Sequence, residues 1–450
     1  MTPGASHLLG PLFGSPAAGA IFSDHGRLQG MLDFEAALAA AEARVGVIPA
    51  AAAAPISAKC RAELFDPTAL AEVTARAGNP AIPLVKRLTA LVAVDAPEAA
   101  RFVHWGASSQ DAMDTGLVLQ LRQALVPIDS DLARLADAVA ALAAAHKMTL
   151  LPGRTWLQHA LPVTFGLKAA GWLDAIERHR ARLASLQPRL SALQFGGAAG
   201  TLAGLGDRGL AVAAALAEEL ELTLPDVPWH TQRDRLAELA TTCGMIVGTL
   251  GKMARDLSLL MQTDVAEAFE PAGDGRGGSS TMPHKRNPVT SAVVLAAATR
   301  APGLVATMLA SMVQEHERGL GGWHAEWTVL PELVILTAGA ISQMADTMAT
   351  LEVDADRMQA NLDVTQGLMM AEALTLALGI KLGRLAAHER VEAACRRAVS
   401  EGRHLRQVLA EDPVVTAQLD TLDFDRLFDP QNYVGAATAL VERVLAARRK

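Results

Sequence analysis

The sequence predicts an all-α fold with three helical domains. Its longer segments repeat apolar residues at spacings of three and four, which is the pattern of a helix with one buried face. No segment alternates apolar and polar residues in the way that a half-buried strand does. The 450-residue chain is 51% hydrophobic and 20% charged, so it can bury a large core and is long enough for several domains.

The first domain is expected over residues 1–110. Residues 1–30 are rich in glycine and proline, and apolar residues then recur at helical spacing until Gly46: Leu32, Phe34, Leu38, Ala41 and Val45. Prolines divide the rest of this domain into short helices, at Pro55, Pro67, Pro80 and Pro83. The domain is therefore expected to be small and helical.

The second domain, expected over residues 111–358, holds longer helices. Amphipathic patterns cover 115–125, 129–146, 162–186, 207–222, 234–262 and 288–314. The segment 234–262 would span roughly 45 Å at about 1.5 Å per residue, and helices of that length usually bury themselves in bundles. It is apolar around much of its girth, so it needs several neighbours, and an oligomeric bundle is one way to supply them. Shorter helical patterns over residues 359–450 form the third domain.

The net charge excludes some classes of partner. A formal charge of −8 at pH 7 argues against nucleic acid or an acidic membrane surface, because both require a basic face. An anionic substrate must then be held by local cations. No apolar stretch reaches about 18 uninterrupted residues, and the N-terminus lacks the pattern of a secretion signal, so no membrane span is expected.

The cysteines indicate a reducing compartment. Cys60, Cys243 and Cys395 are far apart, odd in number and in no CxxC pattern. They therefore predict neither a disulfide framework nor a zinc site, and a cytoplasmic protein is expected.

A glycine-rich segment, residues 275–288, predicts a reactive loop. It contains two serines, Ser279 and Ser280, followed by Lys285 and Arg286. Asn287 and the proline after it read as the N-cap and first position of a helix, whose positive end would face the loop and favour an anion. A plain surface loop is the alternative. A dinucleotide-binding fingerprint is discounted, because it needs a strand before the glycines and a helix straight after them.

Three further polar segments carry candidate site residues. The first, residues 103–111, has a histidine and two serines on a glycine-containing turn, although Ser109 or Asp111 could simply cap the next helix. The second, residues 153–164, is a polar cluster just before a helix. The third, residues 314–327, contains Arg318 and two histidines, but no third metal ligand stands at a useful spacing. No metal is expected.

The run Gly-Ser-Ser-x-Met-Pro-x-Lys-x-Asn-Pro at 278–288 resembles the signature of the fumarase/aspartase superfamily. That superfamily includes fumarases, adenylosuccinate lyases, argininosuccinate lyases and carboxymuconate cycloisomerases. The polar segment 103–111 is similar to its first motif, and segment 153–164 to its second. The resemblance implies a homotetramer whose central helices form a multi-helix core, with each site assembled from different subunits. It implies no cofactor.

The resemblance also implies residue roles. His104 would be catalytic, and the residues expected to hydrogen-bond substrate carboxylates in the same segment are Ser108, Ser109 and Gln110. Ser279 would handle the proton, while Lys285 and Asn287 would stabilise an enediolate. Arg318 resembles an anion-binding arginine. The remaining residues expected to contact the substrate are Thr155, Trp156, Gln158, His159, Ser280 and Met282. Whether His104 or His159 takes part in proton transfer stays open.

One departure from the superfamily pattern selects a branch. In fumarases and adenylosuccinate lyases a histidine follows Arg-Thr in the second motif and handles the proton of the leaving group, whereas this chain has Trp156. A general acid contributes roughly 10²- to 10⁴-fold to a rate, but a carboxylate leaves without being protonated. The tryptophan therefore favours a reaction in which a substrate carboxylate is added or eliminated.

Other positions agree with this branch. Leu12-Phe13 stands where adenylosuccinate lyases resemble one another in Arg-Tyr, so a nucleotide phosphate contact is missing. Residues 21–35 and 319–327 resemble bacterial carboxymuconate cycloisomerases. The expected activity is conversion of 3-carboxy-cis,cis-muconate, a small tricarboxylate, to 4-carboxymuconolactone in the protocatechuate branch of β-ketoadipate degradation. The alternatives are a fumarate-releasing lyase such as an adenylosuccinate lyase and a non-catalytic, crystallin-like scaffold.

Overall fold

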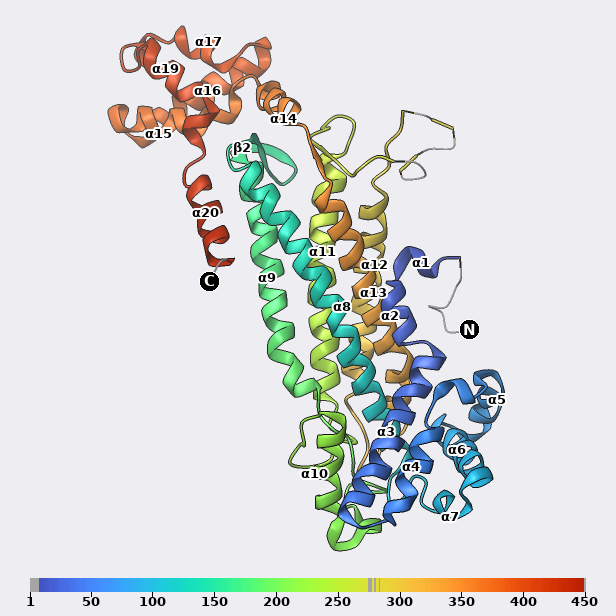
Figure 1. The fold of residues 1–450 in the computed structure, drawn as a ribbon. Helices are drawn as coiled ribbons and strands as arrows, with labels where there is room; N and C mark the ends of the chain where they lie inside the picture. Colours follow the sequence, from blue (N-terminus) through green and yellow to red (C-terminus); the bar gives the residue numbers. More distant parts are fainter. Residues whose placement is uncertain (1–7, 274–276, 279–280, 283, 449–450) are drawn as a thin grey trace. The chain divides into compact units, whose positions relative to one another are not determined.

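Helices dominate the structure, which confirms the predicted all-α class (Figure 1). The computed structural model describes residues 8–273, 277–278, 281–282 and 284–448. Within this part of the chain, strands form only two small antiparallel sheets, β1 with β2 and β3 with β4. Ser279 and Ser280, two residues of the predicted site, lie outside the described residues.

The chain divides into two compact units. Unit 1 comprises Met1–Ala133, Arg178–Gly251 and Val293–Met344, and unit 2 comprises Arg134–Glu177, Lys252–Ala292 and Ala345–Lys450. Five long helices each contribute residues to both units: α8 (Ser109–Ala145), α9 (Phe165–Leu190), α11 (Asp234–Leu260), α12 (Val289–Ala310) and α13 (Gly322–Ala349). The division into three domains at residues 110 and 358 remains a proposal.

Unit 1 also contains the N-terminal helices and α10. Their bounds are α1 Gly10–Phe13, α2 Pro16–Ile21, α3 Asp24–Val45, α4 Ala50–Lys59, η1 Ala62–Leu64, α5 Pro67–Ala77, α6 Ala81–Asp95, α7 Pro97–Ala100, η2 Ala203–Arg208 and α10 Gly209–Leu220. Helix α3 begins where Ser23 Oγ accepts from the Gly26 N–H, and it ends at Gly46 in the left-handed conformation. It crosses α8 closely at a glycine pair, because a Cβ on Gly30 would lie 2.7 Å from the Gly116 carbonyl oxygen.

Unit 2 combines the two small sheets with the C-terminal helices. The strands are β1 Leu150–Thr155, β2 Gln158–Thr164, β3 Ala268–Phe269 and β4 Glu352–Val353. The helices are α14 Ala355–Leu362, η3 Asp363–Thr365, η4 Leu368–Met370, α15 Ala371–Leu382, α16 Arg384–Glu401, α17 Leu405–Ala410, α18 Pro413–Thr416, α19 Thr421–Phe428, η5 Pro430–Tyr433 and α20 Ala437–Arg448. Helices α15 to α19 enclose a core of their own around Leu374, Leu378 and Leu409.

The structure corrects two expectations about the central elements. The polar segment before the helix expected at 162 is a β-hairpin, β1 and β2, and the helix itself begins at Phe165. The expectation of no strands was therefore wrong at this position. The segments 115–125 and 129–146 are one helix, α8, which continues through Pro127.

Two helices among the described residues are apolar and long enough to cross a membrane, judged by length and composition alone. They are α12 and α13, with mean hydropathies of 1.6 and 1.4 over their most apolar windows. In α13, 67% of that window is buried within the chain, as in the core helix of a soluble protein, whereas in α12 the buried share is 28%. Helix α12 is therefore less covered by its own chain than α13 is, and its exposed apolar residues include Val289 (38%) and Leu309 (46%).

Candidate active site

The predicted segment 103–111 is organised in unit 1 by the buried carboxylate of Asp111. Its two oxygens accept five hydrogen bonds, from the N–H groups of Ser108 (2.9 Å), Gly196 (3.0 Å) and Gly197 (2.9 Å), from the Gln194 amide (3.2 Å) and from His230 Nε2 (2.8 Å). The bond to the Ser108 N–H confirms that Asp111 caps α8. This carboxylate therefore fixes the start of α8 against a glycine-rich turn at 196–200.

Two predicted anion-binding residues, Ser108 and Arg318, meet beside this turn. Arg318 Nη2 donates to Ser108 Oγ (3.2 Å) and to the carbonyl oxygens of Gly197 (3.1 Å) and Ala198 (2.9 Å). All three contacts use one guanidinium nitrogen. Arg318 is half-buried, and its Nε and Nη1 have no partner among the described residues. The Nε and Nη1 groups lie on different edges of the guanidinium, so each can still donate a single hydrogen bond to a carboxylate oxygen.

Gln110 is buried beside the start of α8 and does not face the Ser108–Arg318 pair. Its side chain is fully buried, and its amide donates to Asp114 Oδ2 (3.0 Å) and to the His230 carbonyl oxygen (2.8 Å). Both donors are therefore engaged within the protein. Its predicted contact with a substrate carboxylate stays a prediction that this burial does not favour. Ser109, the first residue of α8, is half-buried.

A buried charge network lies under these residues in unit 1. The Arg233 guanidinium, 2% exposed, contacts Asp114 (2.6 and 3.0 Å) on one side and Glu326 (2.5 to 3.1 Å) on the other. Trp323 Nε1 donates to Asp114 Oδ1 at 3.0 Å. Buried ion pairs thus join α8 and α13 to the start of α11. The Arg233 guanidinium donates to both carboxylates, so these buried charges are paired.

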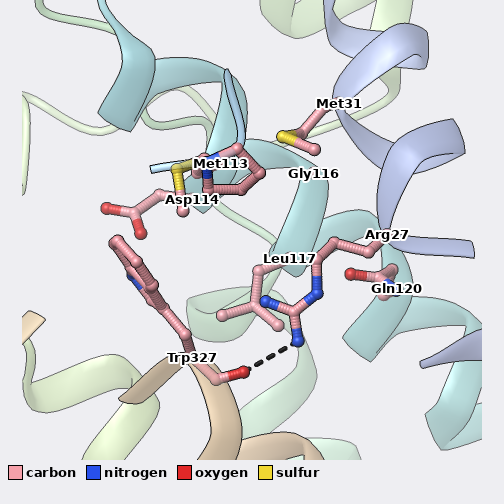
Figure 2. Close-up of a pocket in the computed structure, with 9 residues that line it drawn as sticks. Arg27, Met31, Met113, Asp114, Gly116, Leu117, Gln120 and Trp327 are labelled. Carbon is pink, nitrogen blue, oxygen red and sulfur yellow. Dashed lines mark hydrogen bonds between the residues drawn. The ribbon is translucent and has the colours of Figure 1, made fainter. Parts of the chain in front are cut away.

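The cavity beside Asp114 is too small for the substrate. Arg27 Nη2 donates to the Trp327 carbonyl oxygen at 2.8 Å across its edge (Figure 2). Its volume is about 20 Å³, which is room for about one water. It therefore belongs to the packing of α3 against α8 and α13.

His104 pairs with a carboxylate that the sequence motifs do not identify. Its Nδ1 lies 2.6 Å from Glu35 Oε1, and Glu35 is 1% exposed. Burial lowers the pKa of His104, but the charge of Glu35, its hydrogen bond and the charge of Asp111 together raise that pKa above the ordinary value. The sequence contains one signal that could have identified Glu35, namely an acidic residue on the apolar face of α3, between Leu32 and Leu38.

The second predicted segment forms the hairpin of unit 2, and its tip carries Trp156. Thr155 pairs with Gln158, so Trp156 and Leu157 are the two turn residues, with φ of +52° and +65°. Such turns usually contain asparagine and glycine, because both central residues need positive φ. Trp156 is 98% exposed. Two large apolar residues are therefore held in a strained turn and presented away from their own chain.

Next to the hairpin turn, Arg154 has an ionic partner, whereas the Nδ1 of His159 has none in the described chain. Arg154 makes a two-pronged ion pair with buried Glu267 (2.6 and 2.8 Å), which also accepts from Asn361 Nδ2 at 2.8 Å. The pKa of His159 is lowered by burial and by the Arg154 charge, partly offset by Glu267. Its buried Nδ1 has no partner within the described residues. The lowered pKa favours the neutral form of the His159 imidazole.

The described part of the glycine-rich loop, in unit 2, exposes Lys285 and Met282. Asn287 closes the segment, since its backbone N–H donates to the Gly277 carbonyl oxygen (2.8 Å) and its Nδ2 to that of Gly278 (3.3 Å). Gly277 has a φ of +71°, and a Cβ there would lie 3.1 Å from the Asn287 carbonyl oxygen. The positive φ and this close contact explain why a glycine stands at position 277.

The structure corrects the expected anion site at the helix N-terminus. Helix α12 begins at Val289, and the buried Glu270 carboxylate accepts from the N–H groups of Thr290 (2.8 Å) and Ser291 (2.7 Å). Glu270, and not Asn287, therefore caps α12. The positive helix end is satisfied by this carboxylate within the chain, because Glu270 offers the charge that was expected from a ligand.

Arg286 is also engaged. It makes a two-pronged ion pair with Glu352 at 2.9 Å, donates to the Glu270 carbonyl oxygen at 2.8 Å and lies over the Phe269 ring. The exposed cation left in the described part of the loop is Lys285.

Comparison with known proteins identifies relatives that match most of the chain. The Lyase family model matches residues 14–303, and the model of the adenylosuccinate lyase C-terminus matches residues 367–444. A 3-carboxy-cis,cis-muconate cycloisomerase of Pseudomonas aeruginosa is 62% identical over 442 residues, covering 98% of this chain and 96% of that protein. The nitrosuccinate lyase of Streptomyces davaonensis is 41% identical over 98% of the chain and 94% of that protein.

Solved structures show the same fold. The 3-carboxy-cis,cis-muconate lactonizing enzyme of Pseudomonas putida has a TM-score of 0.94 and 56% identity, covering 99% of each chain. The β-carboxy-cis,cis-muconate cycloisomerase of Acinetobacter calcoaceticus has a TM-score of 0.93 and 43% identity, covering 98% of this chain and 100% of that one. The predicted family is thereby confirmed, and the chain belongs to the fumarase/aspartase superfamily of lyases.

Proposed function

We propose that this chain converts 3-carboxy-cis,cis-muconate to 4-carboxymuconolactone. The observation that carries the proposal is the 62% identity over 98% of the chain to a 3-carboxy-cis,cis-muconate cycloisomerase. The position of Trp156 at the hairpin tip, where the amine- and hydroxide-releasing relatives have histidine, supports it. Arg318 in unit 1 and Lys285 in unit 2 each offer a cation that can pair with a substrate carboxylate.

The reaction is an intramolecular addition in which the substrate trianion gains one proton and becomes a lactone with two carboxylates. One carboxylate oxygen forms a bond to an alkene carbon, and the electron pair of that double bond moves into the conjugated carboxylate as an enediolate. A proton then reaches the adjacent carbon. Preorganised donors must stabilise the enediolate, and we assign this to Lys285 and Asn287. Ser279 supplies the proton. No electron is gained or lost.

Within unit 1, we propose that Arg318 and Ser108 bind one substrate carboxylate. Their 3.2 Å contact and the fixed glycine turn give a preorganised pair of donors. His104, four residues before Ser108, is proposed to contact the same region of the substrate. Substrate contacts are also proposed for Ser109, Thr155, Gln158, His159, Ser280 and Met282, in sites assembled from different subunits.

We propose that the functional unit is a cytoplasmic homotetramer in which sites are shared between subunits. The exposed apolar residues Val289 and Leu309 of α12 and the exposed Trp156 side chain support an assembly in which a second copy covers them. The three free cysteines, of which Cys60 and Cys243 are buried, support a reducing compartment. Light scattering coupled to size-exclusion chromatography measures the assembly directly, and a monomer at micromolar concentration would refute it.

The substrate is tested by a paired assay. Purified protein is followed by ultraviolet absorbance with 3-carboxy-cis,cis-muconate and, separately, with adenylosuccinate. We expect turnover of the first and none of the second. Turnover of adenylosuccinate alone would replace the proposed activity with that of a fumarate-releasing lyase, and turnover of neither would support a non-catalytic scaffold.

Replacing Trp156 by histidine should leave lactonisation no faster than in the parent protein. The leaving group of the reverse reaction is a carboxylate, which gains nothing from a general acid. Histidine also tolerates positive φ at a turn better than tryptophan does, so the unfolding temperature of the variant should not fall. Steady-state kinetics and thermal unfolding check both points. An increase in kcat with Trp156→His would contradict the explanation of the tryptophan.

A further inference from the structure

Two buried glutamates on α3 have no role in the reaction as proposed. Glu35 and Glu42 are 1% and 0% exposed, and they lie seven residues apart on the same face of the helix. Burying a carboxylate is costly unless it is paired or protonated. Glu35 Oε1 lies 2.6 Å from His104 Nδ1, whereas neither oxygen of Glu42 has a hydrogen-bond partner in the described chain. Glu35 is therefore stabilised by a partner, whereas Glu42 has none and must be stabilised in another way.

Glu42 is the protonated member. Burial, and then the charge of Glu35, raise the pKa of Glu42 to about 9. At neutral pH this side chain is accordingly a neutral acid. Glu35 is the partnered member, since its Oε1 contacts His104 while its Oε2 is buried without a partner in the described chain.

The contact also constrains the histidine backbone. His104 has a φ of +58°, a left-handed conformation that a non-glycine residue adopts only when its surroundings hold it there. The bond from Nδ1 to Glu35 supplies such a hold. The other ring nitrogen, Nε2, has no partner among the described residues, and the side chain is 16% exposed. The ring is thus fixed at one nitrogen and available at the other.

We infer that Glu35 is a positioning residue: its carboxylate accepts from His104 Nδ1–H, orients the ring and keeps it as an imidazolium, so that Nε2–H is offered to a substrate carboxylate near Ser108 and Arg318. An imidazolium with one nitrogen held has a single direction in which to donate. That Nε2–H binds a substrate carboxylate rests on the proposed function, whereas the pairing of Glu35 with His104 is independent of it.

The inference fixes a direction of pH dependence. The groups that face His104 are Glu35 on α3 and Asp111 on α8, and Glu35 in turn faces Glu42 and the Cys60 thiol. The folded pKa of His104 is raised, so stabilisation by the pair is complete below the unfolded pKa of about 6.5 and is lost as pH rises through the folded pKa. Activity that uses the imidazolium should fall over the same upper range.

The experiment compares Glu35→Gln with Glu42→Gln as its matched control on the same helix. Histidine labelled at Cε1 is followed by NMR over pH, and the variant His104→Gln assigns the signal. We expect Glu35→Gln to lower the His104 midpoint below that of the parent and to reduce kcat/KM at pH 7 about 10- to 100-fold, the loss expected when one charge-assisted hydrogen bond to the substrate is weakened. Glu42→Gln replaces a neutral acid by a neutral amide and should leave the midpoint in place.

Glu35→Asp provides the rescue, because it restores the charge and should recover a raised midpoint even if its shorter reach lowers activity. An unchanged His104 midpoint in Glu35→Gln would overturn the inference, and so would equal effects of the two glutamine variants. Absence of turnover by the parent protein would refute the proposed function alone, since the NMR titration still measures the pair.

Discussion

Replacing Arg233 by methionine should lower the free energy of unfolding by about 3–5 kcal/mol, because it leaves Asp114 and Glu326 buried without their counter-charge. Arg233 is 2% exposed and contacts both carboxylates directly. Methionine fills a similar volume, so the loss reports the missing charge rather than a cavity. Urea unfolding followed by circular dichroism measures the change.

The exposed ion pair between Arg189 and Glu238 supplies the control. Arg189→Met removes the same side-chain type from a contact that water screens, so its unfolding midpoint should match that of the parent. Equal losses in the two variants would show that the burial of Arg233 is not the cause.

Replacing Ser279 by alanine should abolish lactone formation while leaving the fold intact. The serine is the proposed proton donor to carbon, and a group in this role contributes roughly 10²- to 10⁴-fold to the rate. Lys285, an exposed cation in the same loop, would favour the anionic serine when it acts as a base in the reverse direction. Loss of kcat with an unchanged unfolding midpoint is the expected result.

Ser258→Ala is the control for this variant, because Ser258 Oγ donates only to the Arg255 carbonyl oxygen at an exposed turn of α11. Its kinetics should equal those of the parent. Near-normal turnover by Ser279→Ala would remove the serine from the mechanism and leave His104 as the next candidate for proton transfer.

The long helices were predictable because their signals are local. The expected segment 234–262 is observed as α11, Asp234–Leu260, since Asp234 opens it and apolar residues repeat through Leu257. Pro127 misled the prediction within α8. A proline removes one helical hydrogen bond, but the buried residues before and after it, Leu125 and Ile128, keep the helix continuous.

The hairpin could not be predicted by the usual rules. Trp156-Leu157 is not a turn dipeptide that favours positive φ, and Pro152 and Pro162, which face each other in the ladder, suggest breaks rather than strands. Tertiary contacts behind the turn, such as the ion pair of Arg154 with Glu267, stabilise a conformation that its own residues disfavour.

The motif residues were identifiable from the sequence, but their supporting partners were not. Glu35 is 69 residues from His104, and Glu326 is 93 residues from Arg233. Glu270 takes the capping role expected of Asn287 because β3 brings its carboxylate to the start of α12. Spacing along the chain contains no information about such pairs, which only the packing of distant helices creates.

The closed base of the glycine-rich loop has a consequence for the entropy of binding. The hydrogen bond from the Asn287 N–H to the Gly277 carbonyl oxygen joins the two ends of this loop, and the ion pair of Arg286 with Glu352 anchors its C-terminal end to β4. Joining the ends of a segment of about ten residues costs roughly 2 kcal/mol in chain entropy. Folding has already met that cost, so binding of a substrate at Lys285 and Asn287 does not include the entropy of gathering these two ends.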